Sequence, residues 1–264
     1  MKHCLLGALW GDICGSPYEF NSETDPHKVS LSHPQRHFTD DSVLTLAVAK
    51  AILEKRPYRD TILELALRYP NSGFGQRFMD LWILQRKPEP YSSFGNGSAM
   101  RVSPVAWAFN TIEDVVREAT ATAECSHNHP EGIRIAQAVA VAIFLARKGH
   151  DKEDIADLLE ENFQIPRAFS MDEVREREAA IGWSATYTSI PGAINTFMCT
   201  DSFEECIRQA IALGGDADTQ AAIAGSIAEA YYGPDEAIAA HLPSFLPTDL
   251  LKIYQAFATK YGQG

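Results

Sequence analysis

Apolar residues recur at helical spacing through most of the chain. Between residues 43 and 52, valine, leucine, alanine and isoleucine fall three and four positions apart, which predicts a helix. The same spacing predicts helices at 58–69, 130–146, 202–212, 219–231 and 249–261, with shorter or charged helices at 170–180 and 192–198. No series of segments alternates polar and apolar residues as half-buried strands do. The pattern therefore predicts an all-α fold.

Two of these segments differ from ordinary surface helices. Residues 130–146 are apolar nearly all round, which predicts a buried central helix with Pro130 in its first turn. Residues 219–231 are rich in small side chains, and Ala221, Gly225 and Ala228 would let neighbouring helices approach closely. We find no internal repeat and no low-complexity linker. Residues 1–264 are therefore expected to form one compact domain.

The charge and the cysteine content indicate which partners and which cellular compartment to expect. The chain has 264 residues and a formal charge of -12, which argues against non-specific binding to nucleic acid. Bound cations would still allow it to bind a nucleotide. Its five cysteines are scattered without a C-x-x-C pair, which favours reduced thiols in the cytoplasm. We expect a cytoplasmic monomer without a signal peptide or a membrane-spanning segment.

The candidate chemistry begins with two closely spaced pairs of carboxylates. They are Asp40 with Asp41, and Asp216 with Asp218. Each pair has a neighbouring threonine and precedes an apolar run. Oxygen-only clusters of this kind suit hard cations such as Mg²⁺ or Mn²⁺. Helix capping would explain one acid of each pair, but two such clusters brought together would form a two-metal centre.

A glycine-rich segment, Phe94–Arg101, is the next candidate. Such loops present backbone N–H groups to phosphate or carboxylate, especially at the start of a helix. The segment matches neither the phosphate-binding loop of ATPases nor the dinucleotide-binding fingerprint. An ordinary turn is the alternative interpretation.

Two further residues carry candidate roles outside these clusters. His127 lies just before the apolar helix and is interpreted as a substrate hydrogen-bonding group, whereas His129 fits a helix-entry loop. Glu19 ends the segment Gly11–Glu19, which we expect to be a mobile glycine- and proline-containing loop. Its carboxylate would serve as a general base or metal ligand, and a solvated loop acid is the alternative.

Together these motifs resemble those of the ADP-ribosylglycohydrolase family, which includes dinitrogenase-reductase-activating glycohydrolases and ADP-ribosyl-acceptor hydrolases. The matching stretches, in the family's order, are Gly7–Gly15, Phe38–Ser42, Gly95–Arg101, Ser126–Pro130 and Leu213–Thr219. The resemblance implies an all-α, orthogonal helical domain with a central binuclear Mg²⁺ or Mn²⁺ site. Ser42 departs from the family by replacing a commoner threonine.

The resemblance also implies roles for individual residues. The implied metal ligands are Thr39, Asp40, Asp41, Asp216, Asp218 and Thr219. The implied substrate-binding residues are Gly95, Asn96, Gly97, Ser98 and Met100, for the diphosphate and distal ribose, with His127 nearby and Tyr187 and Ile190 as pocket walls. The implied catalytic groups are Glu19, assisted by Asp41 and Asp216 of the metal cluster.

The implied reaction is hydrolysis of the bond between ADP-ribose and an acceptor, which releases ADP-ribose. The partner would be a mono-ADP-ribosylated protein or an ADP-ribose derivative, with an arginine acceptor favoured and modified nucleic-acid ends left open. A two-metal phosphohydrolase acting on a nucleotide-like substrate is one alternative. A non-catalytic ADP-ribose-binding protein is the other.

Overall fold

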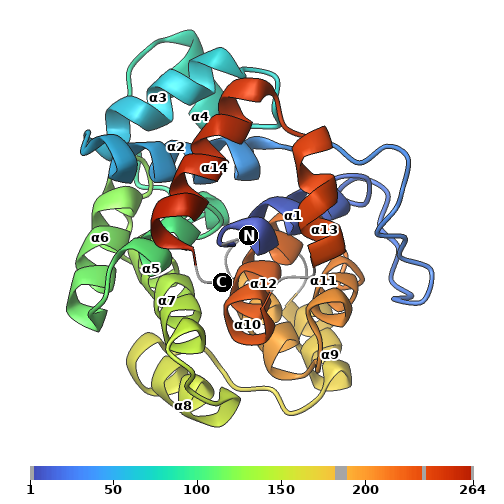
Figure 1. Cartoon of the computed structure of the whole chain (residues 1–264). Helices are drawn as coiled ribbons and strands as arrows, with labels where there is room; N and C mark the ends of the chain where they lie inside the picture. Colours follow the sequence, from blue (N-terminus) through green and yellow to red (C-terminus); the bar gives the residue numbers. More distant parts are fainter. Residues whose placement is uncertain (1–2, 182–188, 234–235, 263–264) are drawn as a thin grey trace.

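Helices make up the described part of the chain, as the sequence pattern predicts (Figure 1). The structure is a computed structural model that describes residues 3–181, 189–233 and 236–262. The long helices are α1 (Leu6–Gly15), α2 (Asp40–Glu54), α3 (Tyr58–Arg68), α6 (Ile112–Glu124), α7 (Pro130–Arg147), α8 (Lys152–Phe163), α9 (Met171–Ile181), α10 (Ser189–Met198), α11 (Phe203–Ile211), α12 (Ala217–Tyr232) and α14 (Thr248–Tyr261). The short elements are α4 (Gln76–Phe78), the π-helix η1 (Met79–Leu84), the 3₁₀ helices η2 (Asn96–Ser98) and η3 (Leu242–Ser244), α5 (Ser103–Ala108) and α13 (Glu236–His241). No β-strand occurs within these described ranges, so the all-α prediction is confirmed.

One hydrophobic core joins the described helices, as in a single compact domain. It runs from Cys4, before α1, to Ala258 in α14. Helix α7 supplies much of it, since twelve of its eighteen residues are buried. The prediction of a buried central helix at 130–146 is therefore confirmed. At the other end of the core, Gly262 packs against the backbone of His3, so the two ends of the described chain meet.

Helices α1 and α12 pack closely at the centre of the fold (Figure 1). Glycine stands at every fourth position of α1, at Gly7, Gly11 and Gly15, and faces the α12 backbone. A Cβ atom on Gly7 would lie 2.0 Å from the carbonyl oxygen of Gly225, and one on Gly15 would lie 2.4 Å from Cα of Asp218. The close approach predicted at Gly225 is thus confirmed. The antiparallel contact brings the C-terminal end of α1 to the N-terminal end of α12.

The segment expected to be a mobile loop is helical over most of its length. Helix α1 continues to Gly15, and every residue from Leu6 to Gly15 is buried. The prediction is wrong because the glycines serve helix packing instead of a turn. Glycine has a low intrinsic helix propensity, but the close packing of α1 against α12 outweighs this cost.

Helices α6 and α8 were also missed by the periodicity, and both carry readable start signals. The side chain of Thr111 accepts a hydrogen bond from Asp114 N, and that of Asp151 accepts one from Asp154 N. Such capping threonines and aspartates mark helix starts in sequence. Helix α10 begins three residues before the predicted 192–198 segment.

A buried acid closes the N-terminal end of α1. The carboxylate of Glu229, on α12, accepts hydrogen bonds from Leu6 N at 3.1 Å and Gly7 N at 2.8 Å. The first N–H groups of a helix lack partners within the helix, so this remote side chain satisfies two of them. Burial raises the pKa of Glu229 to about 7.

Among the described residues, no helix has both the length and the apolar character that crossing a membrane requires.

Candidate functional site

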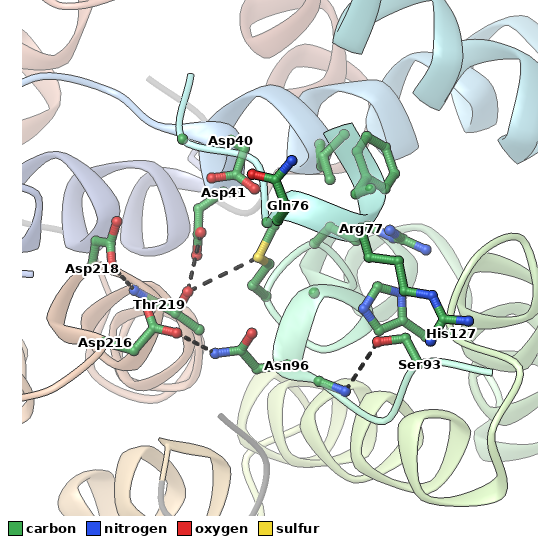
Figure 2. A pocket seen from close by; sticks show the side chains of 18 of the residues that line it. Asp40, Asp41, Gln76, Arg77, Ser93, Asn96, His127, Asp216, Asp218 and Thr219 are labelled. Atoms are coloured by element: carbon green, nitrogen blue, oxygen red, sulfur yellow. Dashed lines mark hydrogen bonds between the residues drawn. The ribbon is translucent and has the colours of Figure 1, made fainter. Parts of the chain in front are cut away.

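A cavity of about 640 Å³ opens where helix ends meet (Figure 2). It lies beyond the C-terminal end of α1 and at the N-terminal ends of α2 and α12. One part of its wall carries Glu19, Asp40, Asp41, Asp216, Asp218 and Thr219. Another part carries Gln76, Arg77, Tyr91, Ser93, Gly95, Asn96, Gly97, Met100, Arg101 and His127. Motifs that lie far apart in the chain therefore share one cavity.

The two carboxylate pairs occupy the first turns of two helices. Asp40 and Asp41 begin α2, and Asp216 directly precedes α12, with Asp218 in its first turn. The partial positive charge of a helix N-terminus favours carboxylates there. Capping accounts for only part of this placement. Thr39 caps α2, the side chain of Asp216 makes no capping hydrogen bond, and Asp218 Oδ1 accepts one bond from Thr219 N at 2.9 Å.

The acids converge from three segments of the chain. Carboxylate oxygens of Glu19, Asp216 and Asp218 lie within 4.8 Å of one another, which is close enough to hold one metal ion. Asp41 lies beside them, where its Oδ2 accepts a 3.1 Å hydrogen bond from the Thr219 hydroxyl. The other oxygen of Asp41 is buried and has no hydrogen-bond partner. That orphaned oxygen and the acidic triad fit a divalent cation with oxygen ligands.

Electrostatics points to the same conclusion. Burial raises the pKa of Asp40, Asp41 and Asp218 well above the ordinary value, and repulsion from neighbouring carboxylates adds to this effect. The pKa of Glu19 rises to about 7 because of burial first and then repulsion from Asp216. The described lining residues include five acids against two arginines. A bound cation would supply the missing positive charge.

Asp12 is a site-forming residue that the sequence reasoning missed. It is fully buried in α1, and its carboxylate accepts hydrogen bonds from Thr39 N at 3.0 Å and Thr39 Oγ1 at 2.6 Å. It also accepts from the backbone N–H of Ser42 at 3.1 Å and from the Ser42 hydroxyl. Asp12 thus holds the first turn of α2 against α1. Its only signal in the sequence is its place inside the motif Gly7–Gly15.

Two residues expected at the site turn their hydroxyls elsewhere. Thr39 does not line the cavity and donates its hydroxyl hydrogen to Asp12. Ser98 also does not line it, since its hydroxyl donates to the carbonyl of Gly132 at 2.7 Å. Tyr187 lies outside the described residues. Ile190 is buried in α10 and does not line the cavity.

The glycine-rich loop meets the acidic cluster through Asn96. Its Nδ2 donates to Asp216 Oδ2 at 2.7 Å, as the dashed line in Figure 2 shows. Gly97 lies over the ring of His127, where a Cβ atom would be 2.9 Å from Nε2. Because that space is filled by the imidazole, this loop position requires glycine. Met100 completes the contact, with its sulfur 4.0 Å from the Thr219 hydroxyl.

His127 is buried on the cavity wall and carries no charge near neutral pH. Burial lowers its pKa well below the usual value, and the nearby Arg101 lowers it further. Its Nδ1 lies 2.8 Å from Ser126 Oγ, and its ring packs against Tyr91 with centroids 5.7 Å apart. Arg77, another residue that the sequence reasoning missed, lies 5.1 Å from the centroid of the Tyr91 ring. A single arginine after a turn-rich segment carries no signal of this placement.

Known proteins match the chain along almost its whole length. The sequence profile of the ADP-ribosylglycohydrolase family matches residues 1–257. Human ADP-ribosylhydrolase ARH3 is 27% identical, over 89% of this chain and 86% of the relative. ADP-ribosyl-[dinitrogen reductase] glycohydrolase of Rhodospirillum rubrum is 31% identical, over 88% and 85%. ADP-ribosylarginine hydrolase Tri1 of Pseudomonas putida is 25% identical, over 88% and 70%.

A solved structure confirms the fold independently of these sequences. A chain described as an ADP-ribosylglycohydrolase-related protein complex superposes with a TM-score of 0.66, over 97% of this chain and 95% of that one, at 22% identity. The resemblance expected from the five motifs is thereby confirmed. The chain belongs to the ADP-ribosylglycohydrolase family, and it is a hydrolase.

Proposed function

We propose that the chain hydrolyses the bond between ADP-ribose and the side chain of a mono-ADP-ribosylated protein, releasing ADP-ribose. The observation that carries this proposal is that the two ends of the cavity carry different chemical groups. Acids gather at one end, and His127 and Arg77 lie at the other (Figure 2). ADP-ribose has a matching polarity, because its diphosphate is anionic and its distal ribose presents hydroxyls. The diphosphate would lie towards His127 and the distal ribose towards the acids.

We further propose that the acidic end holds two Mg²⁺ or Mn²⁺ ions. Their ligands would be Thr39, Asp40, Asp41, Asp216, Asp218 and Thr219. When bound, such ions would supply Lewis-acid sites to which ribose hydroxyls coordinate, which would orient the sugar. Both threonine hydroxyls keep a lone pair for this role, although Thr39 does not line the cavity as the other five proposed ligands do. Thr219 donates its hydroxyl hydrogen to Asp41 and keeps both lone pairs. Thr39 donates to Asp12 and accepts from Asp41 N, which leaves one lone pair.

Glu19 would transfer the proton of the reaction. The water oxygen bonds to C1″ of the distal ribose while the bond from C1″ to the acceptor breaks, with oxocarbenium character. Glu19 takes a proton from the water and returns it to the departing acceptor atom, so that atoms and charges balance. A pKa raised to about 7 suits both transfers near neutral pH. The carboxylates of Asp41 and Asp216 would help to orient the water.

The glycine-rich loop would bind the diphosphate and the ribose. Gly95, Asn96, Gly97 and Met100 line the cavity, so their backbone and side chains are available to a ligand. Ser98 would contribute indirectly, because its hydrogen bond to Gly132 ties the loop to the start of α7. Backbone N–H groups in such turns bind phosphate oxygens.

We favour arginine as the acceptor in the modified protein. The Pseudomonas relative is named for action on ADP-ribosylarginine, and the Rhodospirillum relative is named for ADP-ribosyl-[dinitrogen reductase]. Phe20 is 86% exposed on the cavity rim beside Glu19, where it would contact the carrier protein. Action as a monomer in the cytoplasm is part of the same proposal.

A turnover assay tests the function. The substrate is a peptide with one ADP-ribosylated arginine, incubated with Mg²⁺ or with EDTA, and the products are identified by mass spectrometry. We expect free ADP-ribose and intact peptide, with Mg²⁺ only. AMP with a phosphoribosyl peptide would instead establish the phosphohydrolase. ADP-ribose binding without turnover on any acceptor would establish a non-catalytic protein.

Variants test the metal ligands in the same assay. The double variant Asp216→Asn with Asp218→Asn is expected to abolish turnover and heat of Mg²⁺ binding in calorimetry. Asp172→Asn is the matched control, since its side chain is 91% exposed in an ion pair with Arg175. Undiminished turnover in the double variant would refute the ligand assignment.

A further inference from the structure

We propose that Ser126 and Arg101 are positioning residues that hold neutral His127 in the tautomer protonated on Nε2. That nitrogen then presents an N–H donor to an anionic oxygen of the ligand. The assignment of the ligand oxygen to a phosphate of ADP-ribose rests on the proposed function. The tautomer itself follows from the hydrogen bonds of the described residues alone.

The three side chains form a short buried network. Arg101 is 0% exposed, and its Nη2 donates to the Thr122 carbonyl at 2.7 Å and to Ser126 Oγ at 2.9 Å. Ser126 is also 0% exposed, and its Oγ lies 2.8 Å from His127 Nδ1. Among the described residues, Ser126 is therefore the single link between the arginine and the imidazole.

Counting protons fixes the direction of the link. A guanidinium can only donate, so Ser126 Oγ accepts from Arg101 and keeps one hydrogen of its own. If that hydrogen points at His127 Nδ1, the Ser126 hydroxyl and His127 Nδ1 are both paired. If Nδ1 were protonated instead, the buried serine hydrogen would have no acceptor among the described residues. Protein interiors avoid such unpaired groups, so Nδ1 is the acceptor.

A doubly protonated imidazole is excluded by its surroundings. It would place a second buried cation beside Arg101, and none of the described hydrogen bonds joins the ring to a carboxylate. Neutral histidine with Nδ1 as acceptor carries its proton on Nε2.

The protonated nitrogen faces the place where a ligand would lie. A Cβ on Gly97 would be 2.9 Å from Nε2, and one on Gly95 would be 3.9 Å from it, so this edge lies against the glycine-rich turn on the cavity wall. No described residue forms a hydrogen bond with Nε2. Its N–H is therefore available to a ligand bound over this turn.

The buried charge of Arg101 selects the chemistry of that ligand. Its Nε and Nη1 are buried without partners, and it has no carboxylate in ion-pair contact among the described residues. Donation from a cation polarises the serine hydroxyl and, through it, the imidazole, which strengthens the outer N–H as a donor. An anionic oxygen, such as that of a phosphate, gains most from such a donor.

Nitrogen NMR of the full-length, ¹⁵N-labelled protein tests the tautomer directly. The His127 signals are assigned by their loss in His127→Gln. We expect a pyridine-type Nδ1 and a pyrrole-type Nε2 in the wild type, and a mixture of tautomers in Ser126→Ala. Ser126→Thr retains the hydroxyl and is expected to retain the wild-type pattern. A protonated Nδ1 in the wild type would overturn the proposal.

Ligand affinity supplies the second readout. Calorimetry with ADP-ribose is expected to show Kd raised about tenfold in Ser126→Ala, the effect of weakening one charge-assisted hydrogen bond, and restored in Ser126→Thr. Ser226→Ala is the matched control, because it removes a buried hydroxyl that bonds only within α12. Unchanged affinity in Ser126→Ala, or an equal loss in the control, would count against the positioning role.

The two proposals fail in distinguishable ways. If the protein releases no ADP-ribose from any substrate but His127 carries its proton on Nε2, the proposed function is wrong and the network stands. If ADP-ribose is released and wild-type Nδ1 is protonated, the function stands and the positioning role is wrong.

Discussion

Substituting Gly11 by alanine tests the contact on which the site depends. A Cβ at Gly11 would lie 2.1 Å from the carbonyl oxygen of Ala221 in α12. Non-bonded heavy atoms prefer about 3.5 Å, so the two backbones would have to separate by roughly 1 Å. Tilting α1 relieves little of the clash, because α12 also lies close to Gly7 and Gly15 on either side, where an added Cβ would be 2.0 and 2.4 Å from its backbone.

The expected magnitude follows from two opposing effects. Overpacking a rigid core contact costs about 3 kcal/mol, at the upper end of the usual range, because the atom met is backbone. Replacing glycine by alanine inside a helix returns about 1 kcal/mol. We therefore expect Gly11→Ala to lower the free energy of unfolding by about 2 kcal/mol. Displacing Asp12 and Asp218 at the helix ends would also lower turnover by about 100-fold.

Urea unfolding followed by circular dichroism, with EDTA present, measures the change. Gly75→Ala is the matched control, since a Cβ there would meet no atom within 4 Å and its φ of -54° suits alanine. It is expected to leave stability unchanged or raised by about 0.5 kcal/mol. A Gly11→Ala protein within about 0.5 kcal/mol of the wild type would refute the reasoning.

Three further predictions concern buried or charged groups. Glu229→Gln leaves a helix N–H facing an amide donor, so urea unfolding should show a loss of about 2 kcal/mol; wild-type stability would contradict this. The pKa of Glu19 is raised from 4.5 to about 7, so its contribution to metal-free stability is present below 4.5 and lost as pH rises through 7. As the pH rises from 4.5 to 7, the free energy of unfolding should therefore fall less in Glu19→Gln than in the wild type. Parallel curves of unfolding free energy against pH would disprove the raised pKa of Glu19. Arg77→Ala should raise KM about fivefold at unchanged kcat, with Arg77→Lys intermediate; a fall in kcat alone would exclude a binding role.

Local pattern determined the helical character and the candidate chemistry of this protein. The apolar run at 130–146 became α7, because a segment apolar on all sides is stable only when buried. The paired acids were found because each pair precedes an apolar helix, and short motifs retain that position in any packing. The order of five such motifs was enough to identify the family.

Only the tertiary structure decided which groups face the cavity. In the sequence, Asp12 is one acid among apolar residues. In the fold, α1 packs against α2, and the buried Asp12 carboxylate accepts hydrogen bonds from Thr39 and Ser42. The sequence suggested that the glycines of α1 belong to a loop, and only the packing of α12 against them explains why they are helical. Side-chain direction depends on contacts between segments far apart in the chain, as the bond from Asn96 to Asp216 shows. Hydrophobic periodicity is a property of one helical segment, so it cannot predict contacts between segments far apart in the chain.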